Sequence, residues 1–255
     1  MTTSLSTMRR LVRFFHRLPE ATANSVRFRV PYLLPRWFKV AERLRVAGRP
    51  ISIQYLHNEN AEADFIDCFL LNAYGLGRDL GDVRSIIDVG ANVGFFSLAA
   101  RDYYPDAIIH AYEPNPRVLP HLRANSAAFR VSVFPEAVGE KEGLVNILDE
   151  GPSGEARTRP SGAKDAVRQV SIGTAIERIG GAVDLLKLDC EGAEWDILNA
   201  SGCWNAVRHL RVEVHCFNGE TIDEAKAALE RIGFVATLVD IRSEEMAIIW
   251  AIHRR

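Results

Sequence analysis

The chain has 255 residues, of which 47% are hydrophobic and 25% charged, values that exclude a largely disordered protein and allow a full hydrophobic core. No apolar run reaches the length of about 18 residues that a membrane-spanning helix needs, so the sequence predicts no such helix. The four cysteines form no C-x-x-C pair and no disulfide framework, which favours a reducing, cytoplasmic location.

The net charge of −2 conceals an uneven distribution along the chain. Residues 1–49 carry 11 Lys and Arg and two acids, a charge of +9 (11 − 2), and residues 50–255 carry −11 (20 − 31). A basic arm of this kind favours an anionic partner, such as a membrane surface or the acidic face of a second copy of the chain. A solvated, arginine-rich helical cap explains the charges at least as well, and both hypotheses stay open.

We separate an N-terminal extension, residues 1–80, from a main domain, residues 81–255. The extension begins with an amphipathic stripe over residues 8–18, which predicts a helix lying on the core or on a membrane surface. A region that precedes a nucleotide-type site tends to cover the ligand or to contact the substrate. In this region the pattern predicts a short helix over Val40–Ala47, a strand over Ile51–Leu56 and a helix over Asp64–Tyr74.

The main domain opens with a short apolar strand, Ser85–Val89, followed by a glycine turn and a helical stripe. These form the first unit of an α/β nucleotide site, in which glycine lets a ligand approach the backbone where a Cβ would clash. The spacing is Asp88-x-Gly90-x-Asn92-x-Gly94, not the G-x-G-x-x-G of a dinucleotide site. The acid would repel a phosphate, but it suits an ammonium group such as the amino acid end of S-adenosylmethionine.

A second acid follows at the end of the next predicted strand, Ala107–Glu113. Glu113 lies 25 positions after Asp88 (113 − 88), where a carboxylate can accept hydrogen bonds from both hydroxyls of a ribose. Together with the glycine turn it predicts a nucleoside-bearing ligand. The alternative is a β-turn followed by a surface acid.

Glu136 and Ala137 follow the third predicted strand, Val131–Phe134. In a nucleoside site the adenine ring could lie there, with Glu136 as the partner of its amino group. Residues 150–166 are rich in Gly, Pro and Ser and come after a further short strand, Leu144–Leu148. They predict a mobile flap over the acceptor pocket.

Strands and helices alternate through the main domain, which predicts an α/β fold with a doubly wound, mostly parallel sheet. We expect the helix after Asn115 to start late or to bend, because Pro120 lies too deep for its first turn. A capping box at Thr221 predicts the start of another helix. The remaining strands are expected over Val183–Asp189, Leu210–His215, Phe234–Val239 and Met246–Ile252, the last of them antiparallel.

Four ionisable residues converge at the predicted carboxyl end of the sheet, where ligands bind in such folds. Side chains alternate along a strand, so Lys187 and Asp189 share one face, and Glu213 and His215 share one face of the next strand. A buried Lys187 needs a carboxylate partner, and an internal ion pair would explain it without any catalysis. All four residues together, beside the glycine turn, predict the reaction centre.

Several segments resemble the FkbM-type methyltransferases, over roughly residues 85–215. They are Asp88–Gly94, Tyr112–Asn115, Ala137–Gly139 and the Lys-x-Asp-x-Glu-Gly-Ala-Glu block within Leu186–Glu194. The resemblance implies a class I, Rossmann-like fold with a seven-stranded sheet, S-adenosylmethionine as cofactor, and O-methylation of a hydroxyl on a sugar or other small natural product. By this resemblance the cofactor motif is Asp88, Gly90, Asn92, Gly94 and Glu113, and the motif after the fourth strand is Lys187, Asp189 and Glu191.

The mechanism we expect is in-line attack of the acceptor hydroxyl on the sulfonium methyl group while a base removes the proton. His215 is the better base by its ordinary pKa and Asp189 the better base by the motif, and we favour Asp189. Asp189 with Glu191 or Glu213 could instead hold a divalent cation through carboxylate oxygens.

Functions of other classes would use some of the same residues. A non-catalytic nucleoside-binding protein would keep Asp88 and Glu113, and a membrane-associated interaction protein would depend on the basic N-terminus. The Asn/Asp-Pro-Pro-aromatic block of nucleobase amino methyltransferases is missing after the fourth strand, so we expect a small-molecule acceptor and no nucleic acid.

Overall fold

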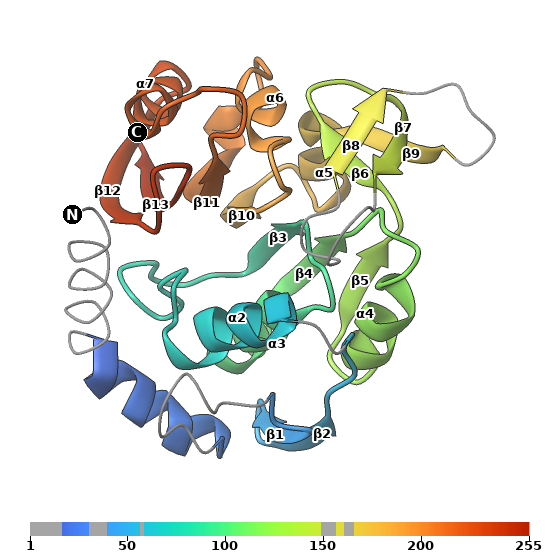
Figure 1. The fold of residues 1–255 in the computed structure, drawn as a ribbon, viewed down its shortest axis with the longest axis vertical. Coiled ribbons are helices and arrows are strands. Elements are labelled where there is room, and N and C mark those ends of the chain that lie inside the picture. The colour runs from blue at the N-terminus through green and yellow to red at the C-terminus, as the bar shows by residue number, and fades with distance from the viewer. Residues whose placement is uncertain (1–16, 31–39, 57–58, 149–156, 161–165, 255) are drawn as a thin grey trace, which may run out of the picture.

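A computed structural model of the chain describes residues 17–30, 40–56, 59–148, 157–160 and 166–254 (Figure 1). Within these ranges no helix is both long and apolar enough to cross a membrane. The amphipathic helix predicted over residues 8–18 falls almost entirely outside them.

The centre of the fold is a seven-stranded sheet in which β13 runs opposite to the other six strands. Its order across the sheet is β12 (Phe234–Ile241), β13 (Met246–His253), β11 (Val207–His215), β10 (Val183–Leu188), β3 (Ser85–Val89), β4 (Ile108–Tyr112) and β5 (Val131–Phe134). This arrangement confirms the predicted doubly wound, mostly parallel sheet with an antiparallel last strand.

Helices cover both faces of the sheet, as Figure 1 shows. One face carries α2 (Glu59–Phe65), the π-helix η2 (Ile66–Leu70), α3 (Phe95–Tyr103) and α4 (Leu119–Ser126). The other carries α5 (Ile172–Arg178), α6 (Glu194–Leu198), the short 3₁₀ turn η4 (Trp204–Ala206) and α7 (Ile222–Arg231). Neighbouring residues of one strand serve different faces: Ile86 packs into the first core and Ile87 into the second.

Two helix starts agree with the capping chemistry of the sequence. The helix after Asn115 begins late, at Leu119, with Pro120 in its first turn, where the missing N–H costs no hydrogen bond. The helix α7 begins after Thr221, whose hydroxyl accepts a hydrogen bond from the backbone N–H of Glu224 while the Glu224 carboxylate accepts one from the backbone of Thr221.

A second, four-stranded sheet lies beside the carboxyl end of the first, and the sequence did not predict it. Its order is β6 (Ala137–Gly139), β9 (Val167–Ser171), β7 (Gly143–Leu148) and β8 (Arg157–Pro160). The prediction of a continuous loop over residues 150–166 is therefore wrong at 157–160, because this stretch pairs antiparallel with β7. The rest of the loop, apart from Ala166, lies outside the described residues, and its role as a flap stays a prediction.

The N-terminal extension contains a hairpin where a helix was expected. The helix predicted over Val40–Ala47 is wrong, because Arg43–Val46 forms β1 and pairs antiparallel with β2 (Arg49–Ser52). Ala47 and Gly48 both have positive φ, +47° and +75°, as a two-residue hairpin turn requires. The helix predicted over Asp64–Tyr74 begins earlier, at Glu59, and ends at Leu70.

The extension packs on the main domain through aromatic rings and ion pairs. Phe28 is fully buried in a helix that is described over residues 17–28, and its ring meets Phe69 edge-to-face at 5.0 Å. The guanidinium of Arg17 lies 2.8 Å from the Asp240 carboxylate, and that of Arg27 lies 2.6 Å from Asp102. The described part of the basic arm thus lies on the core. The boundary at residue 80 and a membrane or self-association role for the arm stay predictions.

Candidate active site

A cavity of about 650 Å³ opens beside the glycine turn and the loop after β10, at the edge of the sheet where the site was predicted. Residues of α2 and η2 from the extension form part of its wall. The predicted site residues that line it are Gly90, Asn92, Glu113, Glu136, Ala137, Lys187, Asp189, Glu191, Glu213 and His215. Asp88 and Gly94 do not line it.

The glycines of the turn are required by the protein's own packing. Gly90 has a φ of +71°, and a Cβ there would lie 1.7 Å from the carbonyl oxygen of Asp189. Gly94 has a φ of +91°, and its Cβ would lie 2.8 Å from the side chain of Leu122. Gly94 therefore clears space for α4 and does not line the cavity, whereas Gly90 clears space for the loop after β10 and also lines the cavity, so its approach to a ligand stays a prediction.

The carboxylate of Asp88 is committed to protein partners. It is fully buried, accepts a hydrogen bond from Ser97 Oγ at 2.7 Å, and lies 3.2 Å from Lys187 Nζ. Since Asp88 does not line the cavity, the prediction that it faces the ammonium group of a ligand is corrected. Its role is to hold Lys187 and the start of α3.

Glu113 reaches the cavity and is held rigidly. Its two carboxylate oxygens accept hydrogen bonds from the backbone N–H groups of Asn92 and Asn115, each at 2.8 Å. Burial raises the pKa of Glu113 to about 7 against the opposing effect of these hydrogen bonds. A carboxylate oxygen has more than one lone-pair direction, so both oxygens can still accept a hydrogen bond from a ligand.

Glu136 and Ala137 lie at another part of the cavity wall, at the start of β6. The Glu136 carboxylate is 2.5 Å from the guanidinium of Arg178 and 3.2 Å from that of Arg168. The side chains of Val138 and Ile147 give this part of the cavity an apolar lining. Contact of Glu136 with an adenine amino group stays a prediction.

Lys187 connects the glycine turn to the loop after β10. Its ammonium group lies 3.2 Å from Asp88 and 3.3 Å from Asp189, and it donates a hydrogen bond to the carbonyl oxygen of Gly90 at 2.7 Å. Burial lowers the pKa of Lys187, but Asp189 and Asp88 raise it further, so the net pKa lies above its ordinary value. The predicted internal ion pair is present, and it orients Asp189.

Asp189 and Glu213 lie side by side, as the strand register requires. Lys187 of β10 pairs with Arg211 of β11, so the positions two residues on also face each other. The hydroxyl of Tyr74 lies 3.0 Å from a carboxylate oxygen of each. One hydroxyl has one hydrogen to donate, so the second contact needs a proton on a carboxyl. Burial and Asp189 hold the pKa of Glu213 well above its usual range, which makes Glu213 the protonated partner, and the Asp189 carboxylate lies 3.3 Å from the ammonium group of Lys187.

His215 completes this end of the cavity. Its side chain is 5% exposed, with Nδ1 at 3.4 Å from Glu194 and Nε2 at 3.7 Å from Glu191. Burial lowers the pKa of His215, but Glu194, Asp189 and Glu191 raise it further, to about 10. The ordinary pKa that favoured His215 as the base is therefore not the pKa it has here, and the ring is protonated at neutral pH.

The block after β10 holds its own loop in place. Glu194 is fully buried and accepts hydrogen bonds from the backbone N–H groups of Cys190, at 2.5 Å, and Gly192, at 2.8 Å. Glu191 has a φ of +56° and points into the cavity. Burial raises the pKa of Glu191 to about 8.

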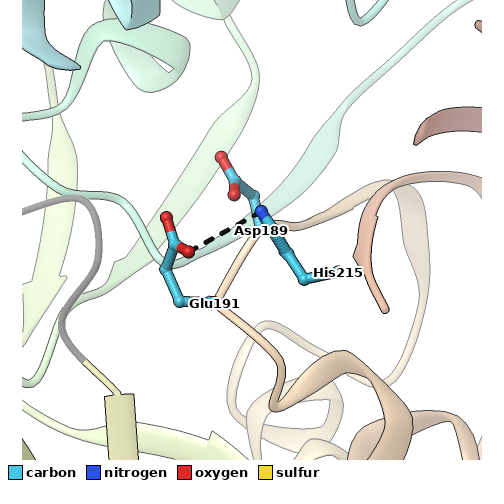
Figure 2. Close-up of side chains that lie close together, drawn as sticks. All are labelled: Asp189, Glu191 and His215. Carbon is cyan, nitrogen blue, oxygen red and sulfur yellow. Dashed lines mark ion pairs between the residues drawn. The ribbon is translucent and has the colours of Figure 1, made fainter. Parts of the chain in front are cut away.

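Asp189, Glu191 and His215 form a set of potential metal ligands (Figure 2). Their donor atoms all lie within 4.8 Å of one another, and Figure 2 shows Glu191 and His215 pointing toward each other. The set contains His215, which the sequence did not predict as a ligand, and it does not contain Glu213. Two carboxylates and an imidazole suit a divalent transition ion better than Mg²⁺ or Ca²⁺, which prefer oxygen ligands.

The cavity wall also contains polar residues that the sequence did not predict, among them Asp64 and Tyr74. Both come from the extension, Asp64 from α2 and Tyr74 from the turn after η2. Burial and the charge of Asp189 raise the pKa of Asp64 to about 7. No spacing in the sequence links either residue to the glycine turn, so only the packing of the extension reveals them.

Comparisons with known proteins agree with this architecture. The model of the methyltransferase FkbM domain matches residues 88–236, more than half of the chain. The chain is 28% identical over 240 residues to the 31-O-demethyl-FK506 methyltransferase FkbM of Streptomyces tacrolimicus, covering 76% of this chain and 89% of that protein. It is 29% identical over 227 residues to the methyltransferase sdnD of Sordaria araneosa, covering 72% and 87%.

A solved structure supports the fold. The fibrillarin pre-rRNA processing protein of Methanococcus jannaschii superposes with a TM-score of 0.50 at 15% identity, covering 86% of this chain and 85% of that one. The seven-stranded sheet is thus that of the class I methyltransferases. With the match over residues 88–236, this chain belongs to the FkbM methyltransferase family.

Proposed function

We propose that this methyltransferase uses S-adenosylmethionine to methylate a hydroxyl group of a sugar or other small natural product. The observation that carries the proposal is the position of the Asp189 carboxylate, which lines the cavity and contacts Lys187 and Tyr74. The relative from Streptomyces tacrolimicus, named as a 31-O-demethyl-FK506 methyltransferase, supports oxygen as the methylated atom.

The cavity residues fit the cofactor. Glu113 offers a rigid carboxylate for the ribose hydroxyls, and the apolar wall near Ala137 and Val138 suits an adenine ring. The acidic lining suits a ligand with a sulfonium and an ammonium group. When bound, S-adenosylmethionine supplies an electrophilic methyl group on its sulfonium.

Asp189 is the residue we place at the acceptor. The acceptor hydroxyl donates its hydrogen to Asp189, and this contact directs the oxygen lone pair toward the methyl group. Asp189 would accept the hydroxyl proton as the acceptor oxygen takes the methyl group that the bound cofactor would supply. Lys187 and Tyr74 hold the Asp189 carboxylate in one orientation, which contributes to the rate by positioning.

Its neighbours are poorer bases at neutral pH. Glu213 carries the proton that its contact with Tyr74 requires, and His215 is already protonated. The positive charge on His215 stabilises the negative charges that surround it. This charge pattern favours Asp189 over His215 and leaves a metal at Asp189, Glu191 and His215 as the second candidate mechanism.

The test is methyl transfer from labelled S-adenosylmethionine to hydroxylated small molecules, with each acceptor compared with its amine analogue. We expect a methyl ether as product, and transfer only to nitrogen would contradict the proposal. Once an acceptor is identified, Asp189→Asn should lower kcat by roughly 10²- to 10⁴-fold, because general-base catalysis is lost. Asp196→Asn, which removes an exposed acid seven positions on, should change kcat little.

A chelator separates the two roles of Asp189. If Asp189 acts as the base, EDTA leaves kcat unchanged and added Mg²⁺ or Mn²⁺ does not raise it. If Asp189 is a metal ligand, EDTA abolishes turnover, and adding back Mg²⁺ or Mn²⁺ restores it. A fully active Asp189→Asn enzyme would exclude both roles.

A further inference from the structure

Asp88, the acid of the glycine motif, cannot contact the ammonium group of a ligand in the cavity. Asp88 is fully buried under Lys187 and Ser97 and does not line the cavity. A ligand with a cationic amino acid end therefore needs another anionic partner on the cavity wall.

Asp64 stands on the cavity wall beside the same turn. It belongs to α2 of the N-terminal extension, and its carboxylate accepts a hydrogen bond from the side-chain N–H of Asn92 at 3.0 Å. Asn92 also donates its backbone N–H to Glu113. The residue Asn92 thus lies between two carboxylates, one suited to a ribose and one with no assigned role.

An unsatisfied atom marks the place next to Asp64. The side-chain oxygen of Asn92 is buried and has no hydrogen-bond partner among the described residues. A buried carbonyl oxygen without a donor is costly, so a donor from a ligand would stabilise this side chain. An acceptor oxygen beside a carboxylate calls for a cationic group with several N–H donors, and an ammonium group has three.

We infer that Asp64 and Asn92 bind the ammonium group of the cofactor's amino acid. This inference rests on the proposed cofactor, and it adds Asp64, which lies outside the family motif, to Asn92, which the motif contains. The cavity then has a partner for each part of the cofactor. The apolar wall near Ala137 and Val138 suits the adenine, Glu113 suits the ribose, and the pair of Asp64 and Asn92 suits the ammonium group. The N-terminal extension then completes the cofactor site.

The test is calorimetric binding of two nucleosides to the full chain. S-adenosylhomocysteine carries the ammonium group, and 5′-methylthioadenosine lacks the whole amino acid. We expect Asp64→Asn to lower the affinity for S-adenosylhomocysteine by roughly 10- to 100-fold, the range for a charge-assisted hydrogen bond. The affinity for 5′-methylthioadenosine should change by less than about twofold. Glu62→Gln, which removes an acid of α2 that does not line the cavity, should change neither.

Equal losses for both nucleosides, or no loss for either, would overturn the inference. If the wild-type chain binds neither, the proposed function fails and the inference fails with it. If the Asp64→Asn variant does not fold, the wild type can be tested with a changed ligand instead. An S-adenosylhomocysteine analogue with hydrogen in place of the ammonium group should bind the wild type roughly 10- to 100-fold more weakly than S-adenosylhomocysteine does. Equal affinity of the wild type for the two would also overturn the inference.

Discussion

Glu113 is a buried carboxyl whose charge changes close to neutral pH. Its pKa is raised to about 7 by burial, with Lys187 and Asp88 as the charged groups near it. The ionised form is the better acceptor for ribose hydroxyls. Because the carboxyl becomes protonated as the pH falls through about 7, affinity for a nucleoside should fall on the acid side.

We expect the affinity for 5′-methylthioadenosine to drop between pH 8 and pH 6, by at most about tenfold per pH unit below the pKa. This nucleoside is chosen because it does not reach Asp64, whose pKa is also about 7. Glu113→Gln should bind roughly 10- to 100-fold more weakly at pH 8 and show no slope over this window. A slope in the variant equal to that of the wild type would assign the titration to another group.

At the scale of elements, the turn after β3 and the loop after β10 are in direct contact. A Cβ at Gly90 would meet the Asp189 carbonyl oxygen at 1.7 Å, and the φ of Gly90 is +71°. Gly181 has a similar φ, +76°, with nothing within 4 Å of its Cβ position. Alanine substitutions at the two glycines therefore distinguish two costs. At Gly181 only the left-handed backbone is strained, and at Gly90 the contact with the Asp189 carbonyl oxygen is strained as well.

Gly181→Ala should lower the free energy of unfolding by about 1–2 kcal/mol, the cost of a left-handed alanine. Gly90→Ala should cost about 1–3 kcal/mol more, because the two loops must also move apart. Urea unfolding of both variants measures the difference. Equal losses would show that the contact contributes nothing beyond the backbone conformation.

Elements with strong local patterns were predictable from the sequence, and elements set by packing were not. The runs that became β3, β4 and β10 are short and apolar, and the capping box of Thr221 marks α7. The β1–β2 hairpin was missed because its turn places Ala47, a residue with no preference for positive φ, in the left-handed region. The second sheet was missed because β8 lies in a Gly- and Pro-rich stretch and gains its order from pairing with β7.

The candidate site also has a part that the sequence predicts and a part that only the packing determines. Strand parity predicted that Lys187, Asp189, Glu213 and His215 converge, since parity needs only adjacent strands in register. The sequence could not predict which group carries a proton, because burial and neighbouring charges decide it: His215 moves from an ordinary imidazole to a pKa of about 10. Asp64 and Tyr74 could not be placed without knowing how the extension packs.

At the scale of the whole molecule, the extension and the main domain share one hydrophobic core. Phe28 is fully buried against Phe69, and the Phe69 ring lies 6.1 Å from that of Phe95 in α3, directly after the glycine turn. The same core continues to Trp250 of β13. We therefore expect the two parts to unfold together.

Phe28→Ala should lower the free energy of unfolding of the whole chain by about 3–5 kcal/mol, because a large buried ring is lost. Val26→Ala, on the same helix at 76% exposure, should stay within about 0.5 kcal/mol of the wild type. Urea unfolding followed by far-ultraviolet circular dichroism and by tryptophan fluorescence should give one coincident transition for each variant. A separate early transition for the extension would contradict a shared core.

The ion pairs of Lys187 have a consequence for how the family can diverge. One buried ammonium serves Asp88 of the turn and Asp189 of the opposite loop. If Lys187 were lost, Asp88 would keep a buried charge without its cation, at a cost of about 3–5 kcal/mol. A lineage that replaces Lys187 by a neutral residue is therefore expected to replace the acid at position 88 as well, whereas Lys187 can outlast a change at position 88 because Asp189 remains its partner. An aligned set in which position 187 is neutral while position 88 stays acidic would count against this pairing.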